Sequence, residues 1–203
     1  MIGFYAQQGK VFKCAYIKWV IMVERKAKID GDYRYWLYRK WDGKDKWLAN
    51  SNRKCLFICI NPNTADNNDD DPTTETCMDF AKNFGCGVLY MVNLYAMIGI
   101  PPKDVIGKPN SIEGKGKDND GYIMKYAEMC SDKDDYIVVA WGNDGRDNNR
   151  AKDVKKLLCD KGYKLYCIRK NKPKRKNETR EPRHPSYLTK AEKDMSKPIP
   201  YPC

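Results

Sequence analysis

The stretch CLFICINPNTAD at residues 55–66 decides the fold, because an apolar run passes directly into a polar turn. Short, nearly continuous apolar runs are typical of strands that are buried on both faces of a sheet. Two similar runs follow, VLYMVNL at 88–94 and YIVVA at 136–140, and a weaker, more alternating run, YKLYCI, lies at 163–168. We therefore predict four strands of one mostly parallel sheet, with the last run at its edge.

Helical patterns separate these runs. Apolar residues recur at helical spacing within 77–84, 122–130 and 151–158, and Gly85 and Gly162 follow two of these segments. Alternation of strands and helices implies right-handed crossovers, with helices on both faces of the sheet. The predicted fold is thus α/β, with three α/β/α layers around a central, mostly parallel four-stranded sheet.

The N-terminal segment has a different character. Residues 1–53 mix basic and aromatic residues, and alternation in DYRYWLYRKW at 32–41 predicts one or two antiparallel strands. A chain of 203 residues suits one domain of ordinary size. We expect a single domain over 1–203, in which 1–53 packs as an extension on a core formed by 54–203.

The charge of the chain favours a polyanionic partner. The formal net charge is +11 at pH 7, and residues 161–183 contain ten Lys or Arg against two Glu. A solvated basic loop is the simpler interpretation of that segment, but its charge also suits contacts with a phosphate backbone. On the second interpretation Lys174, Arg175, Lys176 and Arg183 bind DNA.

The nine cysteines do not resemble a disulfide framework. Their number is odd, no pair has Cys-x-x-Cys spacing, and several lie inside apolar runs, where a free thiol behaves as a small hydrophobe. The longest apolar stretch is far shorter than the ~20 residues of a membrane helix. We expect a soluble, cytoplasmic protein with reduced thiols.

Polar residues end or follow each predicted strand, where ligands of open parallel sheets bind. In order along the chain they are Asn61, Pro62, Thr64 and Asp66, then Asn93, then Trp141 and Asn143, and finally Arg183, His184, Ser186 and Leu188. His184 is the only histidine, and a neutral imidazole can donate one hydrogen bond to a substrate oxygen. Each turn alone is ordinary, but the shared position predicts a site.

The acidic run after residue 65 offers a second interpretation. Asp66, Asp69, Asp70 and Asp71 carry the hard oxygen ligands that divalent cations prefer. Their spacing matches no calcium loop, and Asp71 before Pro72 favours the start of a helix. We therefore expect neither a metal nor a cofactor.

Together, INPNTAD, DDPTTETCMDFAKNFG, VNLYA, AWGN and RHPSYL resemble a bacterial and phage domain family of uncharacterised function over residues 34–200. More distantly, the same order is similar to the uracil-DNA glycosylase superfamily. There an Asp-Pro or Asn-Pro turn ends the first strand, an Asn follows the second, a Trp-Gly follows the third, and a His-Pro-Ser loop comes last.

That resemblance implies roles for individual residues. Asn61 would position the water, Asn93 would read the base, His184 would contact the base or stabilise the leaving anion, and Leu188 would wedge into the duplex. Phe80 or Phe84 would be the stacking aromatic. Because Asn61 cannot act as a base, Asp66 is the first choice for activating water, with Asp71 second. Two differences from the superfamily are Tyr187, where a Pro is usual, and the small Thr64, which leaves room for a modified pyrimidine.

The expected function is hydrolysis of the N-glycosidic bond of an altered or phage-modified base in DNA. That reaction requires a flipped nucleotide, a donor at the base oxygens and a positioned water. Two alternatives are an enzyme that acts on a free nucleotide or modifies a base in place, and a non-catalytic nucleic-acid binder of the same fold.

Overall fold

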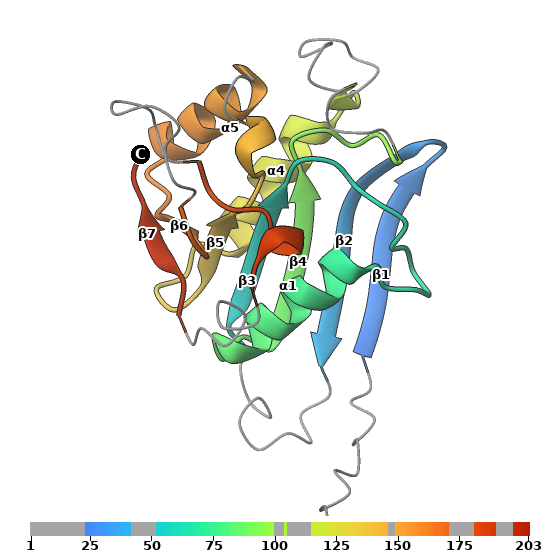
Figure 1. Ribbon diagram of the computed structural model, residues 1–203, viewed down its shortest axis with the longest axis horizontal. Coiled ribbons are helices and arrows are strands. Elements are labelled where there is room, and N and C mark those ends of the chain that lie inside the picture. The colour runs from blue at the N-terminus through green and yellow to red at the C-terminus, as the bar shows by residue number, and fades with distance from the viewer. Residues whose placement is uncertain are drawn as a thin grey trace, which may run out of the picture.

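The computed structural model describes residues 23–41, 52–99, 104, 115–145, 149–170, 181–189 and 197–203. Their seven strands form one sheet in the order β1-β2-β4-β3-β5-β6-β7 (Figure 1). The strands are β1 (Val23–Asp30), β2 (Tyr33–Trp41), β3 (Lys54–Cys59), β4 (Val88–Asn93), β5 (Tyr136–Val139), β6 (Leu165–Cys167) and β7 (Ile199–Tyr201). The helices are α1 (Pro72–Asn83), α4 (Asn119–Met129) and α5 (Asn149–Asp160), with 3-10 turns η1 (Asn143–Gly145) and η2 (Pro185–Tyr187).

The sheet is mixed. β3 pairs in parallel with β4 and β5, and β5 pairs in parallel with β6. β2 joins β4 antiparallel and carries β1 outside it, while β7 joins β6 antiparallel at the other edge. The α/β class is therefore confirmed, but the sheet has seven strands where four were expected in its central part. The short β7, Ile-Pro-Tyr, has too little pattern to be recognised from sequence.

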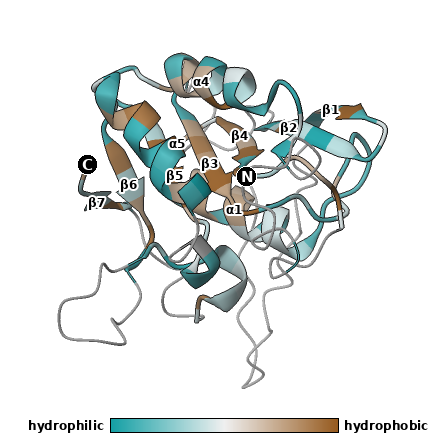
Figure 2. Ribbon diagram, turned by 90° about the horizontal axis from the view of Figure 1, so that it is seen from above, coloured by the Kyte–Doolittle hydropathy of each residue, from teal (hydrophilic) through white to brown (hydrophobic). Residues whose placement is uncertain are grey.

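Helices cover both faces of the sheet (Figure 1). Phe80 and Ala81 of α1 pack in one apolar cluster with Phe57 of β3, whereas Val154 of α5 packs in the other with Leu56. Neighbouring residues of a strand point to opposite faces, so the continuous apolar run of β3 supplies both clusters. Hydrophobic residues accordingly colour the central strands in Figure 2.

The order of the parallel strands creates a switch point. The chain passes from β3 through α1 to β4 on one side, and from β5 through α5 to β6 on the other. Since α1 and α5 lie on opposite faces, the loops that leave β3 and β5 diverge. A crevice at the carboxyl ends of such strands is the usual ligand position in open α/β sheets.

The cysteines follow the sequence expectation with one correction. Cys55, Cys59, Cys77, Cys86, Cys130 and Cys167 are free and buried. Cys159 and Cys203, however, form a disulfide that ties the end of α5 to the end of the chain. Their sequence separation of 44 residues gave no spacing signal for this pair. Within the described residues, no helix is long and apolar enough to cross a membrane.

Candidate functional site

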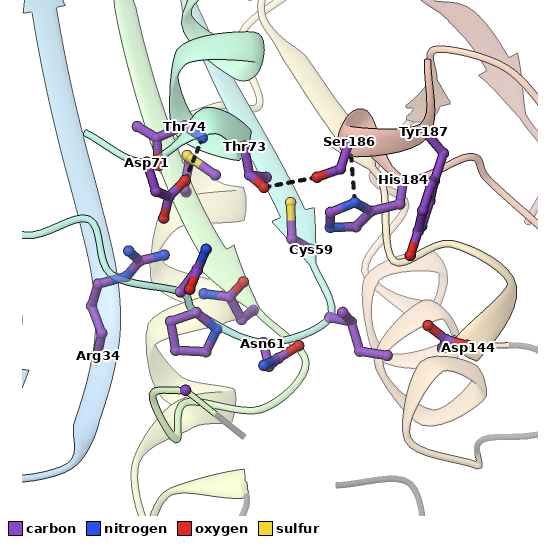
Figure 3. A pocket seen from close by; sticks show the side chains of 16 residues that line it. Arg34, Cys59, Asn61, Asp71, Thr73, Thr74, Asp144, His184, Ser186 and Tyr187 are labelled. Carbon is purple, nitrogen blue, oxygen red and sulfur yellow. Dashed lines mark hydrogen bonds between the residues drawn. The ribbon is translucent and has the colours of Figure 1, made fainter. Parts of the chain in front are cut away.

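A cavity of about 320 Å³ opens where β3 and β4 end. Its size lies at the lower end of the range for small-molecule sites. It is lined by Arg34, Cys59, Ile60, Asn61, Pro62, Asn63, Asp71, Thr73, Thr74, Met91, Asn93, Gly99, Asp144, His184, Ser186 and Tyr187 (Figure 3). Some of the polar residues at the ends of different strands therefore converge, namely Asn61, Asn93, His184 and Ser186.

His184 is held with one ring nitrogen facing its own loop. Nδ1 accepts a hydrogen bond of 3.3 Å from the backbone N–H of Ser186. Because an accepting Nδ1 carries no proton, the neutral ring bears its proton on Nε2. Burial lowers the pKa of His184 to about 4, against the opposing effect of the Asp144 and Asp71 carboxylates. At neutral pH the ring is thus an uncharged donor.

Two contacts fix the position of the His184 loop. Gly142 has φ +78°, and a Cβ at that position would lie 3.0 Å from Cβ of His184. The second contact joins the hydroxyls of Ser186 and Thr73 at 2.9 Å, which connects η2 to the first turn of α1 (Figure 3). Gly142 is therefore favoured for two reasons: it tolerates the positive φ, and its lack of a Cβ leaves space for His184.

Asn93 supplies a buried and unpaired amide. It ends β4, its side chain is 1% exposed, and it lines the cavity. Neither Oδ1 nor Nδ2 has a hydrogen-bond partner among the described residues. Its backbone carbonyl, by contrast, accepts a 2.9 Å bond from the side chain of Asn119. Buried amides are normally paired, so this exception makes Asn93 a candidate for ligand contact.

The turn that ends β3 forms the floor of the cavity. Asn61 and Pro62 both line it, and the carbonyl of Pro62 accepts a 3.3 Å bond from the N–H of Gly99. Cys59, Ile60 and Met91 supply the apolar part of the lining. Asn61 therefore lies in the cavity lining, directly after the end of β3.

Two carboxylates line the cavity: Asp71 accepts hydrogen bonds from the backbone, and Asp144 is exposed to solvent. Asp71 caps α1, and its two oxygens accept bonds from the N–H groups of Thr74 (2.8 Å) and Ala65 (3.1 Å). Asp144 lies in η1, is exposed, and faces the cavity near His184 (Figure 3). The sequence had not singled out Asp144, because a turn residue beside Trp-Gly-Asn has no distinctive pattern.

Asp66 does not line the cavity, which corrects its choice as the base. Its carboxylate accepts bonds from the backbone N–H groups of Asn68 and Asp69, and these bonds lower its pKa. Arg39, fully buried, binds the carbonyls of Asp66 and Asp69 and the carboxylate of Asp70. The acidic run is thus organised by an arginine, and the described residues contain no cluster of three or more potential metal ligands.

The predicted aromatic and wedge residues belong to the core. Phe80 and Phe84 pack with Phe57 beneath α1, and Leu188 is 8% exposed in the same cluster. Helical spacing cannot distinguish a ring that stacks on a base from one that fills the core. The exposed aromatic here is Tyr187, at 68%, beside His184 with ring centroids 6.0 Å apart.

Other predicted residues lie near the cavity without lining it. Trp141 is buried, and its indole N–H donates a 3.0 Å bond to Glu181. Thr64 and Asn143 are exposed outside the lining. The guanidinium of Arg183 donates a 2.9 Å bond to the carbonyl of Tyr187 and so holds η2. Of the predicted DNA-binding residues, Lys174, Arg175 and Lys176 fall outside the described residues.

Arg34 is the main residue that sequence reasoning missed. It is the second residue of the antiparallel strand β2, is 2% exposed and lines the cavity. An arginine in a basic, aromatic segment carries no signal of burial. Its position follows from the direction of β2, whose start meets the carboxyl edge of the parallel strands.

Fold and site together define an α/β protein with a polar cavity at the switch point of its sheet. The chain belongs to the family described as protein of unknown function DUF1643, whose sequence matches residues 34–186. No curated protein matches the chain, and no solved structure matches it either.

Proposed function

We propose that the protein hydrolyses the N-glycosidic bond of an altered or modified base in DNA. One observation carries the proposal: the same cavity contains the Asn93 amide, which has no hydrogen-bond partner among the described residues, and the neutral ring of His184. An amide offers a donor and an acceptor side by side, which is the pattern needed to read the edge of a base. The order of the motifs, which resembles the uracil-DNA glycosylase superfamily, supports the same reaction.

The chemistry assigns each group one task. The bond between C1′ and the base nitrogen breaks, and its electron pair leaves with the base. His184 donates a hydrogen bond from Nε2 to a base oxygen as negative charge grows there. With its pKa at about 4, the ring is uncharged at neutral pH. The N–H of an uncharged imidazole is a very weak acid, so it stabilises the leaving anion by a hydrogen bond and keeps its proton.

The attacking water needs a position and a proton acceptor. Asn61, on the floor of the cavity, is suited to hold the water, but its amide cannot take a proton. Asp144 is the carboxylate of the lining that is exposed, whereas Asp71 is engaged by backbone N–H groups. In this proposal the water oxygen bonds to C1′, its proton passes to Asp144, and the released base takes a proton from solvent.

One observation favours a second candidate, hydrolysis of a free nucleotide. Arg34 places a cation in the lining of the cavity itself, where a phosphate of a small substrate can reach it. A DNA substrate would instead place most of its phosphates outside the cavity, on the basic surface.

Abasic-site formation tests the proposal. Duplexes that each carry one modified base are incubated with the protein, treated with alkali and resolved by size. Cleavage at the modified position is expected for at least one base, with a loss of at least about 100-fold in His184→Ala, since a single electrostatic donor contributes about that much. A panel without cleavage above background, or an unchanged His184→Ala, would refute it.

A further inference from the structure

Arg34 is buried at the edge of the cavity, and the antiparallel direction of β2 explains this position. β2 runs antiparallel to β4, so the first residues of β2 lie beside the last residues of β4. The backbone N–H of Arg34 donates a 2.8 Å bond to Ala96, just beyond Asn93. The guanidinium thereby lies on the β4 side of the cavity, and His184 lies on the opposite side (Figure 3).

The guanidinium is incompletely paired. Nη1 donates a 2.7 Å bond to the carbonyl of Ala65, but Nε is buried without a partner among the described residues. Asp71 opposes the lowering effect of burial on the pKa of Arg34, yet the described residues include no ion pair between them within 4.0 Å. A buried charged donor without an acceptor is costly for the free protein.

Arg39, on the same strand, shows that this fold can satisfy a buried arginine. Its Nε binds the carboxylate of Asp70 at 2.7 Å, and Nη2 binds the carbonyl of Asp66 at 2.7 Å. Both arginines hold the loop after β3, but only Arg34 lines the cavity. Of these two buried arginines, the one with an unpaired Nε is therefore the one that lines the cavity.

The first turn of α1 does not explain this arrangement. Helix N-termini favour anions, and Thr73 and Thr74 line the cavity. Asp71 already accepts the N–H of Thr74, however, so this helix end has its anion. Among these groups, Nε of Arg34 is the charged donor that has no acceptor within the described residues.

We propose that Arg34 binds an oxyanion of the substrate, either a carboxylate carried by the base or a phosphate of the same nucleotide. The inference rests on the proposed function, because it assumes that Asn93 and His184 hold the base in this cavity. The anion then lies on the Arg34 side of the base. A charged acceptor is the partner that best compensates a buried guanidinium.

Binding to matched pairs of ligands tests the proposal without catalysis. Titration calorimetry compares 5-methyluracil with 5-carboxyuracil, and deoxyuridine with deoxyuridine 5′-monophosphate. We expect the charged member of at least one pair to bind the parent about ten-fold more tightly or better. A preference in the first pair assigns the anion to the base, and one in the second assigns it to the phosphate.

Variants distinguish anion binding by Arg34 from a structural role in holding the loop after β3. Arg34→Gln should abolish the preference and Arg34→Lys should reduce it, while Arg39→Lys, which changes the other buried arginine, should retain it. The proposal is overturned if no charged member is preferred, if the preference survives Arg34→Gln, or if Arg39→Lys removes it equally. Preference without abasic-site formation would refute the glycosylase reaction alone, and abasic-site formation without preference would refute the anion site alone.

Discussion

His184 owes its suitability as a donor to its neighbours. The N–H of Ser186 occupies Nδ1, and burial lowers the pKa of the ring. Charging the ring would break the contact with Ser186, since both nitrogens would then be donors. The neutral state of His184 is therefore built into the loop.

Stability should fall in mild acid because of His184. Its folded pKa of about 4 lies below its ordinary value of 6.5, so the unfolded chain binds the extra proton. The loss begins as the pH falls through 6.5 and is complete below 4. Relative to His184→Asn, the parent should lose about 1–2 kcal/mol of unfolding free energy between pH 7 and pH 5 in urea titrations. Equal losses would contradict the assignment.

Replacing Asn93 should impair base binding without destabilising the fold. Because its amide has no partner, Asn93→Leu should change the unfolding free energy by less than about 1 kcal/mol, or raise it, while base binding is lost. Denaturant titration and calorimetry measure the two effects.

Asn119 is the matched control. It is equally buried, but Nδ2 donates to the carbonyls of Asn93 and Leu94, so Asn119→Leu should destabilise by about 1–3 kcal/mol. A large destabilisation by Asn93→Leu would mean that its amide is structural.

Among the elements, the turn after β5 has a testable role. Gly142 and Gly162 have φ of +78° and +79°, so alanine at either should cost about 1 kcal/mol or more. Only the Cβ of Gly142→Ala would meet His184, whereas nothing lies within 4 Å at Gly162. We expect Gly142→Ala alone to shift the imidazole signals in ¹⁵N-edited NMR spectra, which are unambiguous with one histidine in the chain. Equal spectra for both variants would contradict this contact.

The sequence predicted which strand ends meet but not which side chains point inward. Asn61 follows the first apolar run, Asn93 lies at the end of the second, and His184 comes after the last, and the fold brings all three to one cavity. Phe80 has the same helical spacing whether it stacks on a ligand or fills a core, and Asp66 can bond its own loop as easily as a water. Those choices depend on packing that periodicity does not encode.

Arg34 was missed for a related reason. Its place in the cavity depends on the pairing of β2 with β4, a contact between segments distant in sequence. Burial of its charge depends on the Ala65 carbonyl and on Asp71, which belong to a third segment. Local pattern contains none of these relations.

At the scale of the whole molecule, net charge separates the two candidate substrates. With +11, the protein should bind DNA with an affinity that falls steeply with salt, because each phosphate contact releases counterions. A free nucleotide should show a shallow dependence, since it makes few such contacts. Fluorescence anisotropy from 50 to 200 mM salt is the measurement, and a shallow slope for duplex DNA would favour the nucleotide enzyme.

The most direct test of the central claim is detection of the released base. DNA carrying candidate bases is incubated with the protein, and the products are analysed by mass spectrometry. We predict a free base and an abasic sugar in equal amounts, with both products strongly reduced in Asn93→Leu and His184→Asn. DNA that remains intact, or base release that is equal in the parent and both variants, would contradict the assignment of this cavity as a glycosylase site.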